Sequence, residues 1–260
     1  MRINLDKLFL SLNDPAFVID EEISLDLAGK EGEHHQIEKA DIDFLTSYFS
    51  NKFSASLLEG AARSLFEISS NAFDNIMLAW ISELPVEREI TAYAGEVLAA
   101  AQGFNSFDDK RRAAGKAANN RTNADALTVL TTAYKVQIEV HRMMGLLRFS
   151  VNEDGEFIAR CEPDHFILPC LGDFFTARFG DTPWTIIDEK RGLALHRKAK
   201  GQAKINVLEE SGEDFSSAKR DEWEELWKHY HKTINNEDRN NPDLQRQLMP
   251  KRYWKHLPEV

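Results

Sequence analysis

The chain is poor in cysteine and lacks long apolar runs. Only Cys161 and Cys170 occur among 260 residues, too few for a disulfide framework and at a spacing that matches no common zinc knuckle. We therefore expect a reducing, cytoplasmic environment. No stretch approaches the roughly 20 apolar residues that span a bilayer, and the first ten residues do not resemble a signal peptide. We expect no membrane association.

Strong catalytic motifs are also missing. The sequence contains no phosphate-binding glycine loop, no Gly-x-Ser-x-Gly and no His-Glu-x-x-His. It therefore assigns no reaction, cofactor or metal, and leaves open whether the chain is an enzyme. What is present is ordinary: 42% hydrophobic and 29% charged residues, enough apolar material for a globular core.

The excess of acid lies in the first hundred residues. The chain carries a net charge of -11, and residues 1–100 hold 18 of its 43 acids and 7 of its 32 bases. Residues 101–260 are therefore neutral on balance and contain local basic runs at 107–122, 189–207 and 251–260. A polyanionic partner is compatible with this second region but not with the first.

Helical periodicity dominates the first half. Residues 1–40 read as an irregular acidic segment, and apolar spacings of three and four follow to about residue 101. Pro85 breaks the pattern, and a further helix is expected near Val86. Residues 103–123 are expected to form a connecting loop. A long helix capped by Asn123 or Asp125 then ends at Gly145. One stripe of this helix, with Val129 and Val136 beside it, consists of Ala126, Leu130, Ala133, Gln137, Val140 and Met144.

Two hairpins are expected after residue 145. Alternating strands at 147–151 and 157–161 flank the turn dipeptide Asp154-Gly155, and strands at 184–188 and 193–197 form the second pair. Between the hairpins, Asp164 can cap a short helix with Pro169 in its first turn. A last helix has an apolar face formed by Trp223, Leu226, Trp227, Tyr230 and Ile234.

These elements predict an α+β protein. A mostly helical N-terminal half precedes a small antiparallel sheet of hairpins packed with helices. We expect one domain over residues 41–260, with a helical part at 41–145 and a hairpin-and-helix part at 146–260.

Carboxylates and imidazoles form one set of candidate residues. Glu162 or Asp164 beside His165 could perform acid–base catalysis or bind a metal, because a neighbouring carboxylate tunes an imidazole. The alternative is that Asp164 only caps a helix. Asp188 and His196, on the second hairpin, complete the candidate catalytic set.

Cationic and aromatic residues form a second set, the candidate contacts to nucleic acid. They could grip phosphates, lie in a groove or stack on bases. Each group also has a structural alternative. Arg142 and Arg148 could only place charge near a helix end, and Arg178 could pair with Asp181 beside a core Trp184. The second hairpin could be a solvated turn, and the aromatic residues of the C-terminal segment could clamp that segment onto the core. The set comprises His141, Arg142, Arg148, Arg178, Trp184, Lys190, Arg191, Lys251, Arg252, Tyr253 and Trp254.

Four segments in order resemble one bacterial family, the probable DNA metabolism proteins. They are EVHRMMGLLRF at 139–149, EPDHF at 162–166, GDTPWTIID at 180–188 and MPKRYWK at 249–255. The resemblance covers about residues 125–258. Members lie beside a putative DNA modification or repair radical SAM protein, or are fused to a uracil-DNA glycosylase-like domain. The resemblance thus implies a DNA-repair context and a radical SAM partner, but no reaction.

Three hypotheses follow. The first is an accessory or processing protein of DNA repair or modification that binds DNA or a DNA-bound partner. The second is an enzyme acting on a nucleotide or damaged base through the carboxylate and histidine set. The third is an interaction module whose acidic N-terminal half docks a basic partner.

Overall fold

The computed structural model describes residues 8–9, 13, 39–51, 53–152, 154–208, 229–230, 232–233 and 241–257. The expected irregular segment at 1–40 and the expected last helix around Trp223 lie almost entirely outside these residues. The chain divides into two compact units, one of residues 1–44 and 52–138 and the other of residues 45–51 and 139–260. Helices α3 (Lys39–Tyr48) and α8 (Ala124–Leu146) contribute residues to both.

The first unit is helical. Its elements after α3 are η1 (Ala55–Leu57), α4 (Gly60–Ile68), α5 (Ser70–Trp80), α6 (Glu87–Gln102), α7 (Phe107–Ala118) and the beginning of α8. The break at Pro85 and the helix that follows it are confirmed, because Val86 is the N-cap of α6.

The expected loop at 103–123 is wrong, because α7 occupies most of it. Alanine has the highest helix propensity, and acidic residues in the first turn with Lys116 in the last turn complement the helix dipole. Ala114 and Ala118 are buried, and the Tyr93 hydroxyl donates to the Ala118 carbonyl oxygen at 3.0 Å. A helix that buries only alanines shows little apolar periodicity in its sequence.

The long helix α8 is confirmed, with Asn123 as its cap: the Asn123 side chain accepts from the Ala126 N–H at 2.9 Å. Its buried stripe agrees only in part with the expected one. Ala126 and Ala133 are buried, as are Val129 and Val136 beside them, whereas Gln137 is exposed and Met143 is buried instead. Glu139 lies on the buried stripe, so this helix directs a carboxylate into the interior of the second unit.

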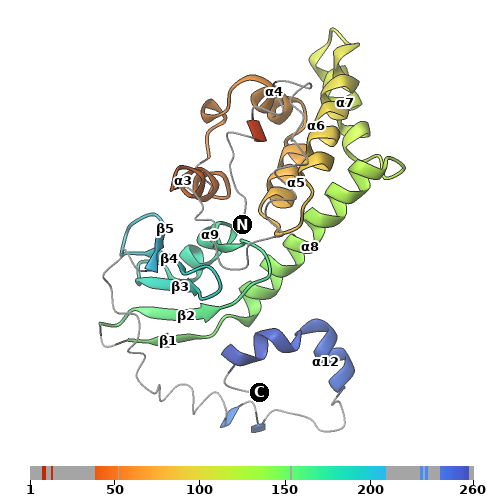
Figure 1. Ribbon diagram of the computed structural model, residues 1–260. Helices are drawn as coiled ribbons and strands as arrows, with labels where there is room; N and C mark the ends of the chain where they lie inside the picture. Colours follow the sequence, from red (N-terminus) through yellow and green to blue (C-terminus); the bar gives the residue numbers. More distant parts are fainter. Residues whose placement is uncertain are drawn as a thin grey trace, which may run out of the picture. The chain divides into compact units, whose positions relative to one another are not determined.

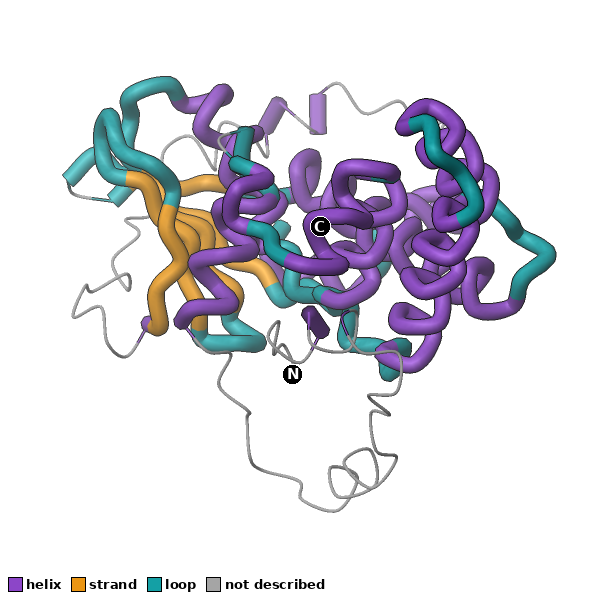
Figure 2. Tube along the Cα trace, turned by 90° about the horizontal axis from the view of Figure 1, so that it is seen from above, coloured by secondary structure: helices purple, strands orange, loops and turns teal. Residues whose placement is uncertain are grey.

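The second unit contains a five-stranded sheet in the order β1-β2-β3-β4-β5 (Figures 1 and 2). The strands are β1 (Phe149–Val151), β2 (Phe157–Cys161), β3 (Trp184–Asp188), β4 (Leu193–Arg197) and β5 (Lys204–Val207). The helices are α9 (Leu168–Phe179), α12 (Pro242–Leu248) and the 3-10 helix η3 (Lys251–His256).

Both expected hairpins are confirmed, and with them the α+β class. The Asp154-Gly155 turn has Gly155 at φ +78°, a conformation that favours glycine. The sheet is mixed rather than purely antiparallel, because β2 and β3 pair in parallel. Helix α9 returns the chain from the end of β2 to the start of β3, and a crossover of that kind produces parallel strands.

Helix α9 packs against part of the sheet, and its buried residues contribute to the apolar core there. It contacts β3 and β4, and the Phe175 ring lies 6.2 Å from the ring of Trp184. Pro169 stands in its first turn, as expected, but the expected cap is wrong: the N-cap is Ile167, with no side-chain cap hydrogen bond. Asp164 is thereby available for other contacts.

Candidate functional site

The polar residues gather where β2 and β3 end. The parallel register pairs Cys161 with Asp188, so the residues that follow, Glu162 and Glu189, leave the sheet side by side. The Glu189 N–H donates to the Cys161 carbonyl oxygen at 2.9 Å, which extends the pairing by one residue. We call this end of the two strands the carboxyl edge. Ligands in open α/β sheets commonly bind at such an edge.

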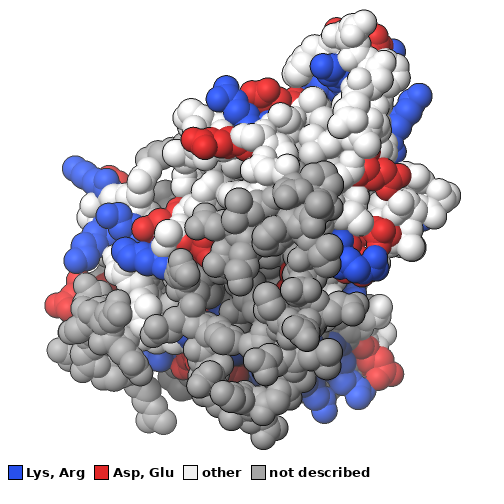
Figure 3. All heavy atoms as spheres, turned by 45° about the horizontal axis from the view of Figure 1, so that its top comes forward, with Lys and Arg blue, Asp and Glu red and all other residues white. Residues whose placement is uncertain are grey.

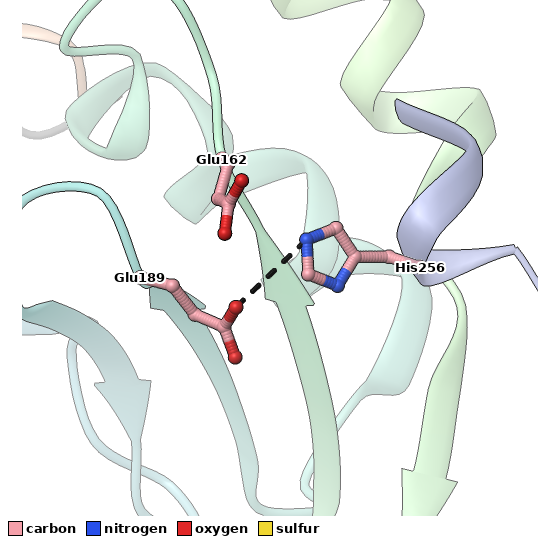
Figure 4. Close-up of side chains that lie close together, drawn as sticks. All are labelled: Glu162, Glu189 and His256. Carbon is pink, nitrogen blue, oxygen red and sulfur yellow. Dashed lines mark ion pairs between the residues drawn. The ribbon is translucent and has the colours of Figure 1, made fainter. Parts of the chain in front are cut away.

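Three side chains with metal-ligating atoms converge there (Figure 4). Ligand atoms of Glu162, Glu189 and His256 all lie within 4.8 Å of one another. The His256 Nε2 atom is 4.0 Å from Glu189 Oε2 and, although buried, has no hydrogen-bond partner in the described part of the chain. Burial lowers the pKa of His256, in spite of the nearby Glu189 carboxylate, so its imidazole is mainly neutral at neutral pH.

Two cations cover the glutamates. Lys255 Nζ donates to a carboxylate oxygen of Glu162 and, at 3.2 Å, to Glu189 Oε2. Arg160 donates to the other oxygen of Glu189 at 3.2 Å. Partial burial raises the pKa of Glu189, but the hydrogen bonds from Lys255 and Arg160 outweigh it, so the pKa is lower than its ordinary value. Glu189 therefore carries its charge near neutral pH.

A buried ion pair supports the loop behind these glutamates. Asp188 is fully buried and lies 2.6 Å from Arg191, whose side chain is 7% exposed. Arg191 also donates to the Pro163 and Asp164 carbonyl oxygens at 3.1 and 2.9 Å. Burial raises the pKa of Asp188, and Arg191 opposes that rise. The pair thus fastens the loop after β2 to the loop after β3.

A second buried carboxylate fastens the C-terminal segment. Glu139, which is 3% exposed, accepts from the Asp164 and His165 N–H groups at 2.8 Å each and from the Tyr253 hydroxyl at 2.6 Å. Burial and the Glu139 charge raise the pKa of Tyr253. Arg252 completes the group, 2.7 Å from an Asp164 oxygen and 4.7 Å above the Tyr253 ring.

The candidate catalytic residues separate into three groups. Glu162, Asp164 and His165 lie at the carboxyl edge, with the Glu162 and Asp164 side chains 38% and 48% exposed. Asp188 is also there, but its burial against Arg191 gives it a supporting position. The placement of His196 with them is wrong. It pairs with Thr185, three residues from the edge and roughly 10 Å along the strand.

Several candidate nucleic-acid contacts are engaged in the fold. Trp184 is fully buried and Tyr253 is 4% exposed, so neither ring can stack on a base; the core and clamp interpretations are correct for these two. Trp254 Nε1 donates to the Met249 carbonyl oxygen at 2.9 Å, and Lys251 lies 5.7 Å from its ring. Arg191 is buried in its ion pair, which excludes the solvated-turn interpretation for it.

The remaining candidates lie in separate places. Lys190 donates to the Asp164 carbonyl oxygen at 3.0 Å and so belongs to the carboxyl edge. His141 is exposed on α8, while Arg142 donates to the Gln247 carbonyl oxygen at 3.2 Å and Arg148 to that of Gly145 at 3.0 Å. Arg178 is exposed at the end of α9.

The expected partner of Arg178, Asp181, lies instead 3.9 Å from Arg197. On the face seen in Figure 3, several Lys and Arg side chains (blue) lie beside Asp and Glu side chains (red).

Five residues of this site were not predicted from the sequence: Glu139, Arg160, Glu189, Lys255 and His256. Glu139 sits on the inner stripe of α8, a signal visible only once the stripe is placed correctly. His256 follows Lys255 in the aromatic and basic C-terminal segment, far from both glutamates along the chain. Their proximity depends on the parallel pairing of β2 and β3, which the pattern of hairpins did not predict.

The fold and the site define an α+β protein with a carboxylate and histidine cluster at the carboxyl edge of a mixed sheet. Residues 104–259 match the model of a family described as a domain of unknown function, DUF4130. This match covers more than half of the chain, so the chain belongs to that family. Comparisons with curated proteins and with solved structures each found no match. In the part of the chain that is described, no helix is long and apolar enough to cross a membrane.

Proposed function

We propose that this chain is a processing protein of DNA repair or modification that acts on a nucleotide or an exposed base at the carboxyl edge. The DNA context rests on the resemblance of its four segments to DNA metabolism proteins. The location rests on one observation: the loop that carries Glu162, Asp164 and His165 is held in place by hydrogen bonds to Glu139 and to Arg191 of the buried Asp188–Arg191 pair. Half-exposed carboxylates held on a fixed loop are suited to general acid–base chemistry.

The balance of charge favours a small polar ligand over an extended phosphate backbone. The network contains five carboxylates and five cations: Glu139, Glu162, Asp164, Asp188 and Glu189 with Arg160, Lys190, Arg191, Arg252 and Lys255. Non-specific DNA binding requires several unneutralised cations along the groove. A balanced network instead recognises one nucleotide by directed hydrogen bonds, as sites for extruded or single-stranded bases do.

The resemblance also supports a partner. A radical SAM protein of DNA modification or repair, encoded beside family members, is the proposed partner. In that arrangement the partner holds the DNA, and this chain receives the exposed nucleotide.

Binding and product analysis test the proposal. Single-stranded and duplex oligonucleotides, with and without a damaged base, are titrated by fluorescence anisotropy at two salt concentrations. We expect single-stranded DNA to bind more tightly than duplex, with a shallow salt dependence. Mass spectrometry of the oligonucleotides after incubation then reports chemistry, which Glu162→Gln removes and Asp154→Asn, in the exposed hairpin turn, retains.

Absence of binding to every oligonucleotide and to free nucleotides at both salt concentrations would contradict the proposal. A steep salt dependence with equal affinity for duplex would favour backbone binding and also contradict it.

A further inference from the structure

The cluster of Glu162, Glu189 and His256 has the composition of a metal site. Each residue comes from a different segment: the loops after β2 and β3, and the end of η3 (Figure 4). Two carboxylate oxygens and an imidazole nitrogen are ligands that zinc, manganese and related divalent ions accept. Three protein ligands leave coordination positions for water or substrate, as in catalytic sites.

The His256 imidazole is a second, independent indication. Its Nε2 atom is buried without a hydrogen-bond partner among the described residues, and the Glu189 Oε2 atom lies 4.0 Å away. A buried polar atom left unsatisfied costs free energy, so most native structures provide a partner. Nothing in the described packing donates to or accepts from this nitrogen, whereas a cation between it and the carboxylates would satisfy it.

A cation already occupies the neighbouring position. The Lys255 ammonium bridges Glu162 and Glu189, and its side chain is 60% exposed. A long, exposed lysine side chain can turn toward solvent at little cost in packing. The two carboxylates would then face His256 without their bridging cation.

We propose that Glu162, Glu189 and His256 bind one divalent transition-metal ion in exchange for the Lys255 ammonium. Bonds of about 2.0–2.2 Å place ligand atoms roughly 3 to 4.4 Å apart. The present spread of up to 4.8 Å requires only a small contraction, which rotation of the partly exposed glutamates supplies. The inference deepens the proposed function, and it rests on that function only for the role of the ion. At the carboxyl edge the open coordination positions would take water or a phosphate oxygen.

Calorimetric titration of the full chain with MnCl2, without nucleic acid, measures the site directly. We expect one ion per chain. Glu162→Gln, Glu189→Gln and His256→Gln should each weaken binding by about tenfold or more, because loss of even an outer partner of a ligand costs about that much. Asp154→Asn and His141→Gln, both at exposed positions of the same unit, serve as matched controls and should bind as the wild type does.

Lys255→Met distinguishes a metal site from a simple clamp. Removing the ammonium should tighten Mn²⁺ binding by about fivefold or more, because the ammonium and the ion compete for the same carboxylate oxygens and repel each other. Mn²⁺ should also raise the melting temperature of the wild type but not of His256→Gln. The shift in melting temperature can be measured only for variants that fold. Circular dichroism of each variant therefore detects any loss of folding separately.

Two results would overturn the metal site. One is wild type and Lys255→Met binding Mn²⁺ no better than the three ligand variants. The other is His256→Gln retaining full affinity while the glutamate variants lose it. If oligonucleotides bind but Mn²⁺ does not, the metal site is wrong and the proposed function stands. If Mn²⁺ binds but oligonucleotides do not, the proposed function is wrong and the metal site stands.

Discussion

The two ends of the parallel β2–β3 pair use their charged residues differently. At the carboxyl edge, charged side chains pair with one another and join three chain segments, as in the Asp188–Arg191 pair and the Lys255 bridge. At the opposite end, the buried Arg197 side chain donates to backbone carbonyl oxygens of Gly180 and Gly201. Charged side chains therefore bind backbone groups at both ends, but at the carboxyl edge they also form a network of ion pairs that joins three chain segments.

Topology explains the difference. Parallel strands end at the same edge, so the loops after β2 and β3 meet there and both carry polar residues. The other end receives the tight turn after α9, where Gly180 adopts φ +59° and leaves backbone groups to be satisfied. We therefore expect substitutions at the carboxyl edge to lower both the stability of the fold and the affinity for oligonucleotides. Substitutions of exposed residues at the other end should change neither.

The largest effect is expected from Arg191→Met. It leaves Asp188 buried without its partner and removes the donors to Pro163 and Asp164, and breaking a buried ion pair costs about 3–5 kcal/mol. Urea unfolding followed by tryptophan fluorescence measures the loss. A decrease below about 1 kcal/mol would show that the pair does not hold the carboxyl edge together.

A smaller loss is expected from Glu139→Gln. The amide nitrogen cannot accept hydrogen bonds, so at least one of the three donors from Asp164, His165 and Tyr253 is left unsatisfied. Such a loss costs about 1–3 kcal/mol. Limited proteolysis should then cut the C-terminal segment faster than in the wild type. Gln137→Glu, an exposed position on the same helix, is the control and should not change the cleavage rate.

An acid-dependent effect is expected at Glu189. Its folded-state pKa is lowered from 4.5, so its contribution to stability is present above the unfolded-state pKa and is lost as pH falls through the folded-state pKa. The wild type should therefore exceed Glu189→Gln in stability at neutral pH and lose that advantage well below pH 4.5. Paired urea titrations at both pH values check this. A constant difference at both pH values would contradict it.

The smallest effect is expected from Arg178→Ala at the other end of the sheet. Arg178 is exposed, and exposed substitutions usually change stability by less than about 0.5 kcal/mol. Oligonucleotide affinity should also stay at the wild-type value. A large loss of affinity in the same anisotropy titration would show that the binding surface lies elsewhere than at the carboxyl edge.

Local patterns in the sequence predicted much of the fold. The Asp154-Gly155 turn, the second hairpin and the Asn123 cap were readable because each depends on neighbouring residues. Helix α7 could not be predicted from the sequence pattern, because its buried residues are alanines, which give little hydrophobic contrast.

The site was only partly predictable. Glu162, Asp164 and His165 could be proposed from the sequence because they follow a strand as a dense polar segment. Glu139 and His256 were missed, since a glutamate on a helix usually faces solvent and a histidine after a lysine gives no sign of a distant partner. The parallel register and the burial of Glu139 bring these residues together, and both are long-range properties of the fold.

Hydrogen–deuterium exchange of the full chain, with and without a single-stranded oligonucleotide in MnCl2, tests the central claim most directly. Peptides covering residues 161–165, 188–192 and 250–257 report on the carboxyl edge, and peptides covering 178–184 and 197–203 on the opposite end. The account predicts slower exchange in the first three alone. Protection at the opposite end, or at neither end, would contradict it.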